Sequence, residues 1–179
     1  KIRLTLEEID RESFDKAADA IVAARRIYIV GLRSSASIAT FLGFYFNLIF
    51  DNVVMISANT VSEVLESLLR VGEGDVVIGI SFPRYSSRAV QAMSFARDRG
   101  ATTIAITDSE VSPLASIAQY TLKARSDMAS FVDSLVAPLS LVNALLVAVS
   151  RKKNEDLSKT FETLEKIWEE YGVYEKTLE

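Results

Sequence analysis

The sequence of 179 residues contains no cysteine and no histidine. Without cysteine the chain has no disulfide framework, no thiolate metal site and no cysteine nucleophile. Without histidine it lacks the side chain that most often acts as a general base near neutral pH and the commonest protein ligand of metals. Carboxylates and lysines can still act as bases, so these absences disfavour catalysis without excluding it. We expect no cofactor and no metal site.

The sequence also lacks a basic stripe and a long apolar run. Its net charge is −4 and its pI is about 5.1, whereas affinity for DNA comes mostly from lysine and arginine. We therefore do not expect this chain to bind nucleic acid by itself. The most apolar stretch, 135–149, is shorter than the roughly 20 residues that span a bilayer. It predicts a buried helix, so we expect no membrane partner and a cytoplasmic location.

Short apolar runs alternate with helical patterns along the chain. The runs typical of strands are 27–30, 53–56, 75–80, 102–107 and 120–123. The helical patterns are 6–24, 34–47, 60–71, 86–99, 113–118, 131–150 and 155–171. This alternation predicts an α/β fold, a three-layer α-β-α sandwich around a five-stranded parallel sheet.

No glycine-, serine- or proline-rich linker interrupts the chain, so we expect residues 1–179 to form one domain. The chain begins with lysine and not with methionine, which suggests a fragment of a longer protein. The pattern at 131–150 is apolar on nearly every face. A helix shared with a partner subunit would explain that composition.

Two serine-rich turns follow the first and third expected strands, and each directly precedes a helical pattern. The first reads GLRSS at 31–35, and the second reads SFPRYSS at 81–87. Helix N-termini offer free N–H groups and the positive end of the helix dipole, which favour a phosphate. In the strand order 2-1-3-4-5, the first and third strands are neighbours where the winding reverses, and ligands bind there. We therefore expect both turns to form one anion-binding pocket.

The two turns differ in specificity. The first lacks the further glycines of a dinucleotide fingerprint and the Gly-Lys-Ser/Thr of a P-loop, and an ordinary turn with a serine N-cap explains it equally well. In the second, Pro83 fixes the local backbone, and Arg84 adds a fork-shaped charge suited to phosphate. Ser86 and Ser87 can cap the following helix while offering hydroxyl groups.

Both turns resemble those of the SIS (sugar isomerase) domain, in particular the C-terminal effector-binding domain of RpiR/MurR-type transcriptional regulators. GLRSS resembles the family's Gly-x-Gly-Ser-Ser turn, with Arg33 in place of the second glycine. SFPRYS matches a variant of the family's phosphate loop, in which Arg84 replaces a glycine. GDVVIGIS at 74–81 and IAITD at 104–108, followed by SPLA at 112–115, resemble two further segments. The resemblance covers residues 25–150 approximately.

The resemblance implies a flavodoxin-like sheet, a homodimer or tetramer, and a sugar phosphate as the effector. It also implies a helix-turn-helix domain outside this chain, through which alone DNA would be bound. The expected phosphosugar-binding residues are Arg33, Ser34, Ser35, Ser81, Arg84, Ser86 and Ser87. The two arginines favour a more acidic ligand, such as a sugar acid phosphate or a bisphosphate, unless Arg33 fills the pocket.

Two other functions stay open. A sugar-phosphate isomerase on the same fold needs a base beside the substrate. Arg88 stands where relatives often have glutamate, which leaves Glu63 and Glu66, although capping and surface charge explain both. The other possibility is a dimerisation module whose pocket binds nothing. Weaker candidates for contacts with a sugar are Ser57, Asn59, Ser130 and Asp133.

Overall fold

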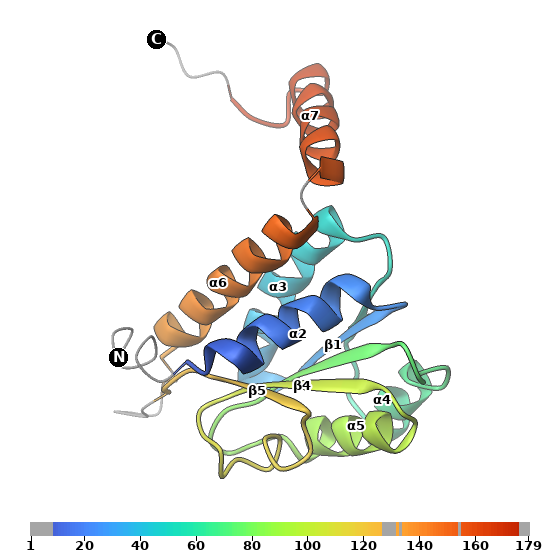
Figure 1. Cartoon of the computed structure of the whole chain (residues 1–179), viewed down its shortest axis with the longest axis vertical. Helices are drawn as coiled ribbons and strands as arrows, with labels where there is room; N and C mark the ends of the chain where they lie inside the picture. The colour runs from blue at the N-terminus through green and yellow to red at the C-terminus, as the bar shows by residue number, and fades with distance from the viewer. Residues whose placement is uncertain (1–8, 127–131, 133, 154, 176–179) are drawn as a thin grey trace.

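The computed structural model describes residues 9–126, 132, 134–153 and 155–175. Five parallel strands form one sheet in the order β2-β1-β3-β4-β5, which confirms the predicted order. The strands are β1 (Ile27–Gly31), β2 (Val53–Ile56), β3 (Val76–Ile80), β4 (Thr102–Thr107) and β5 (Tyr120–Lys123). Helices α2, α3 and α6 lie on one face of the sheet and α4 and α5 on the other, which confirms the three-layer sandwich (Figure 1).

Local signals explain where several helices begin. The helices are α2 (Arg11–Ala23), α3 (Ala36–Ile49), α4 (Val61–Ser67), α5 (Ser87–Asp98), α6 (Val136–Lys153) and α7 (Glu155–Glu170). Asp10 caps α2, because its carboxylate accepts hydrogen bonds from the backbone N–H groups of Glu12 and Ser13. Thr60 and Glu63 form a reciprocal capping box at α4. Gly100 follows α5 with a positive φ of 82°, which is typical of a helix C-cap.

Four expectations about helices differ from the structure. The helices expected at 6–24 and 131–150 begin later, at Arg11 and at Val136. Residues 113–118 form turns and not a helix, because local bonds, such as the one that Ala115 N donates to Ser112 Oγ over 3.1 Å, satisfy the backbone there. Helix α4 ends at Ser67, well before the expected residue 71. The apolar surface of α6 needs no partner subunit to cover most of it, because α6 packs against α2 and α3 of the same chain (Figure 1).

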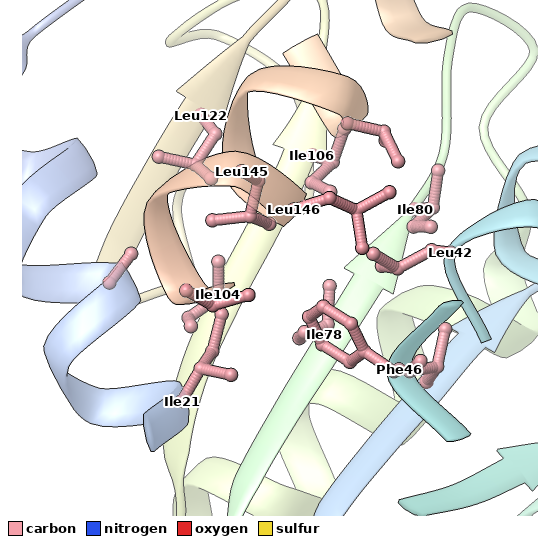
Figure 2. Close-up of a cluster of buried hydrophobic side chains, with 14 of the residues drawn as sticks. Ile21, Leu42, Phe46, Ile78, Ile80, Ile104, Ile106, Leu122, Leu145 and Leu146 are labelled. Atoms are coloured by element: carbon pink, nitrogen blue, oxygen red, sulfur yellow. The ribbon is translucent and has the colours of Figure 1, made fainter. Parts of the chain in front are cut away.

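The apolar core has two halves, one on each face of the sheet. Figure 2 shows the larger half, where side chains of α2, α3 and α6 gather over the isoleucines of β3 and β4. Ile29 belongs to this half, whereas its neighbour Val30 packs with α4 and α5 on the opposite face. Successive residues of a strand point to opposite faces, so a central strand that is covered on both sides is apolar at every position.

Helix α7 extends away from the sheet at the end of the molecule (Figure 1). Its first apolar residue, Leu157, is buried, but Phe161 and Ile167 are 38% and 44% exposed. None of the described helices has the length and apolar character needed to cross a membrane.

Candidate functional site

Strands β1 and β3 end side by side, so the chain leaves the same sheet edge after both. Gly31 at the end of β1 pairs with Ile80 at the end of β3. The two following loops enclose a cavity of about 440 Å³, which is lined by Leu32, Arg33, Ser34, Ser35, Ser81, Phe82, Pro83, Arg84 and Ser86. The fold thus brings six of the seven expected site residues together. Ser87 lines a neighbouring cavity of about 610 Å³ that also includes Arg84 and Tyr85.

The first loop is held tightly against α3. A Cβ atom on Gly31 would lie 2.7 Å from both the Ser35 carbonyl oxygen and the Ala39 Cβ, so only glycine fits there. A single 3-10 turn, Arg33–Ser35, follows and leads into α3. Ser35 directly precedes α3, yet its side chain makes no capping hydrogen bond. Its hydroxyl is therefore not used to satisfy the N-terminus of α3, where Ala36 N–H donates instead to the Arg33 carbonyl.

The second loop is shaped by its own serines. Ser81 Oγ accepts a hydrogen bond from Ser86 N over 3.0 Å, which closes the loop. Ser86 Oγ accepts one from Ala89 N over 3.4 Å as the N-cap of α5. Ser81 N in turn donates to the Ile106 carbonyl over 3.1 Å, which ties the loop to β4. Both hydroxyls accept bonds inside the protein, but each retains a hydrogen with which it can donate to an anion.

Arg33 and Arg84 share an unusual backbone conformation. Their φ angles are +57° and +64°, and no other non-glycine residue of the described chain has a positive φ. This left-handed conformation costs a residue with a Cβ about 1–2 kcal/mol. Both side chains are exposed, so packing does not account for the choice of arginine over glycine.

A hydrogen bond that the sequence did not predict joins the second loop to the end of β4. The Tyr85 hydroxyl donates to Asp108 Oδ1 over 2.7 Å, and Thr107 Oγ1 lies 3.2 Å from the same oxygen. Burial, together with the bond to Asp108 and its negative charge, raises the pKa of Tyr85 above its ordinary value. Tyr85 lies in SFPRYS and Asp108 in IAITD, two segments that were singled out by their motifs. The two residues follow the neighbouring strands β3 and β4. The two motifs, together with the predicted strand order, could therefore have indicated that Tyr85 and Asp108 lie close together.

Glu63 and Glu66, the two candidate bases, do not line this cavity. Glu63 Oε2 accepts hydrogen bonds from the backbone N–H groups of Asn59 and Thr60 over 2.8 and 3.0 Å. These bonds hold the pKa of Glu63 below its ordinary value. The Arg88 guanidinium donates to the carbonyls of Ala58 and Asn59. The side chains of Glu63 and Arg88 therefore organise the loop before α4.

The weaker candidates fall elsewhere. Glu66, Ser57 and Asn59 are exposed and do not line the cavity. Ser130 and Asp133 lie outside the described residues. Within the described ranges, no three carboxylate side chains are grouped in a way that could hold a metal ion. The cavity therefore offers serine hydroxyls, two guanidinium groups and the N-termini of α3 and α5, a set of groups suited to an anion.

Comparisons with known proteins agree with this fold. The SIS domain model matches residues 20–148. The sugar isomerase domain of an RpiR transcription factor from Sphaerobacter thermophilus is 30% identical, with a TM-score of 0.86 and 92% of each chain covered. The Vibrio vulnificus NanR protein, solved with ManNAc-6P, has the same fold at 19% identity, with a TM-score of 0.80 over 93% of this chain and 64% of that chain.

A curated relative is similar at the level of sequence. It is an uncharacterized HTH-type transcriptional regulator of Caldanaerobacter subterraneus subsp. tengcongensis, 29% identical over 91% of this chain. The present chain spans 58% of the length of that regulator. The matched residues, the strand order and the two loops at the switch point lead to one assignment: the chain belongs to the SIS domain family, in the form found in RpiR transcription factors.

Proposed function

We propose that this domain binds a phosphosugar as the effector of an RpiR-type transcriptional regulator. The observation that carries the proposal is the cavity between the loops after β1 and β3, with Arg33 and Arg84 in its lining and no acidic residue. A helix of 14 residues and one of 12 residues begin at this cavity, and free N–H groups at helix N-termini bind phosphate well. The expected site residues, Ser87 included, stay part of the proposal.

The relatives support a regulator over an enzyme. The sequence-level relative is named as a transcriptional regulator, and NanR was solved with a sugar phosphate, ManNAc-6P. Isomerisation needs a base that moves a proton between adjacent carbons. Within the described residues, no carboxylate lines the cavity, and Glu63 is engaged in its capping box. We therefore favour a binding role, with an isomerase as the alternative.

The geometry suggests how a bound ligand would act. The two loops that line the cavity come from β1 and β3 and lead into α3 and α5, which lie on opposite faces of the sheet. A phosphosugar held by both loops would favour the arrangement in which they are close, and so would shift the population of conformations. We propose that this shift reaches a helix-turn-helix domain outside this chain, in a regulator that works in the cytoplasm.

We also propose that the domain forms a homodimer or a tetramer. Large apolar side chains stay exposed on two neighbouring helices and on α7. Phe44 of α3 is 61% exposed, Val147 of α6 is 51% exposed, and Ile167 of α7 is 44% exposed. Phe44 and Val147 belong to helices that pack against each other, and a contiguous exposed apolar patch is typical of a surface that another protein chain covers.

Thermal unfolding with a ligand panel tests the binding role. The panel contains sugar phosphates, sugar acid phosphates and the matching free sugars, each at millimolar concentration. A ligand that binds only the folded state raises the Tm by mass action. We expect a rise with at least one phosphorylated sugar and none with its free sugar. The absence of a rise with every phosphate would overturn the proposal and leave a dimerisation module as the better account.

Two variants make this test specific. Arg84→Gly removes the charge and suits the positive φ of this position, so the variant should fold while its ligand-induced rise in Tm becomes smaller. Arg70→Gln removes one positive charge at an exposed residue that does not line the cavity. The Arg70 variant should keep the full rise.

A further inference from the structure

The cavity holds two arginines from different loops, and neither is neutralised. Arg33 and Arg84 form no ion pair with a carboxylate of the described residues. Other arginines of the same domain do have partners. Arg25 binds Asp75 through two hydrogen bonds, and Arg97 pairs with the adjacent Asp98. Both cavity arginines therefore carry a positive charge that no carboxylate of the described residues offsets through an ion pair.

The backbone gives a second reason to regard both charges as functional. At φ angles of +57° and +64°, glycine would be the residue without steric strain. Both positions instead carry the side chain with the largest permanent, fork-shaped set of hydrogen-bond donors. Since both residues are exposed and line the cavity, what they add at these positions is positive charge at the cavity and not packing.

One phosphate does not require this much positive charge. A phosphate monoester carries about −1.5 to −2 charges near neutral pH. The N-termini of α3 and α5 and the serine hydroxyls already provide donors for it. An arginine fork pairs with one carboxylate or one phosphate through two parallel hydrogen bonds. Two forks on two loops therefore match two separate anionic groups better than one.

We propose that the effector carries a second anionic group besides its sugar phosphate, so that it is a sugar acid phosphate or a sugar bisphosphate. The phosphate binds at the loop of Arg84, where Ser81 and Ser86 also lie, and the second anion pairs with Arg33. This inference rests on the proposed phosphosugar function and names the class of ligand for the same site.

Isothermal titration calorimetry of the full chain with two matched ligand pairs tests the inference. The pairs are gluconate 6-phosphate with glucose 6-phosphate, and fructose 1,6-bisphosphate with fructose 6-phosphate, all at one ionic strength because salt screens charges. We expect the ligand with two anionic groups to bind about tenfold more tightly in at least one pair, since a hydrogen-bonded charge contributes about that factor.

Arg33→Gly identifies the group responsible. The substitution suits the positive φ of residue 33, so the free variant should unfold at a Tm no lower than that of the parent chain. Its affinity for the ligand with two anionic groups should fall more than its affinity for the monophosphate, so that the preference within the pair moves towards equal affinity. Arg33→Lys keeps the charge and should retain part of the preference, and Arg70→Gln should retain all of it.

The outcomes separate this inference from the function on which it rests. Equal affinity of the parent chain for both members of each pair would overturn the proposal that the effector carries a second anionic group. It would leave the proposal of phosphosugar binding intact. A preference that persists in Arg33→Gly would also overturn the assignment to Arg33. If none of the four ligands binds, the proposed function itself fails.

Discussion

The hydroxyl of Tyr85 donates a hydrogen bond of 2.7 Å to Asp108 Oδ1 across 23 residues of sequence. Tyr85 lies in the loop after β3, and Asp108 directly follows β4, the neighbouring strand. The bond therefore connects the loop that lines the cavity to the edge of the sheet. It lies next to Arg84, whose backbone is strained, and so it helps to hold that residue in place.

Replacing Tyr85 with phenylalanine should loosen this loop without removing any group from the cavity lining. We expect a loss of about 0.5–1.5 kcal/mol in the free energy of unfolding, which is typical of one hydrogen bond. We also expect weaker binding of the phosphosugar that stabilises the parent chain. Urea unfolding and calorimetry measure the two effects. Tyr120→Phe, on β5 and outside the cavity lining, is the control that should keep ligand affinity; unchanged affinity in Tyr85→Phe would contradict the role in positioning.

Gly31→Ala should disturb the first loop by steric overlap. The added Cβ would lie 2.7 Å from the Ser35 carbonyl oxygen, which is backbone and cannot move away cheaply. We expect a cost of about 1–3 kcal/mol in the free energy of unfolding, together with a loss of ligand binding. Gly72→Ala is the matched control, because its Cβ would meet no heavy atom closer than 3.8 Å. Equal stability of both variants in urea unfolding would show that the close contact is unimportant.

Asp75 should make stability depend on pH in acid. It is fully buried, and although burial alone raises its pKa, hydrogen bonds from Arg25 and Gly72 N–H outweigh that effect and hold the pKa below the ordinary 3.8. Because the folded-state pKa is lowered, its contribution to stability is fully present above pH 3.8 and is lost as the pH falls through the folded-state pKa.

Asp75→Asn separates this contribution from that of other carboxylates. At pH 7 the variant should unfold with a free energy about 1–3 kcal/mol lower than that of the parent chain. The difference between the two proteins should narrow below pH 3.8, where Asp75 becomes protonated first in the unfolded chain and then, at its lower folded-state pKa, in the folded protein. Urea unfolding over this pH range measures it, and a constant difference down to strong acid would contradict the assignment.

Glu63→Ala tests whether this carboxylate is a cap or a base. Because Glu63 accepts two backbone hydrogen bonds at the start of α4, the variant should have a lower Tm. Ligand affinity should stay unchanged, since Glu63 does not line the cavity. Incubation with aldose and ketose phosphates completes the test: steady turnover by the parent chain that is lost in the variant would support the isomerase instead.

Ile167→Asp tests association through α7. We expect the parent chain to sediment as a dimer or a larger assembly, and the variant as a smaller species, because a charge on the apolar face opposes its burial. Ser158→Asp is the control, since residue 158 lies on the opposite side of the same helix. A parent chain that sediments as a monomer at micromolar concentration would refute the proposed association.

Much of the fold could be predicted because its signals are local. The strands β2, β4 and β5 have the predicted bounds, since short apolar runs bounded by turn residues specify buried parallel strands. The capping box at Thr60 was equally visible in the sequence. Residues 113–118 were misassigned because a short apolar pattern fits a helix and a series of turns alike.

The sequence by itself determined the alternating strands and helices, the sheet they form, and the two serine-rich turns that carry the candidate site. Only the tertiary structure decided the left-handed backbone of Arg33 and Arg84, the bond between Tyr85 and Asp108, and the placement of Ser87 outside the main cavity. The reason is physical: periodicity and capping act within a few residues, whereas φ angles in a loop and bonds between distant residues depend on how neighbouring strands bring their ends together.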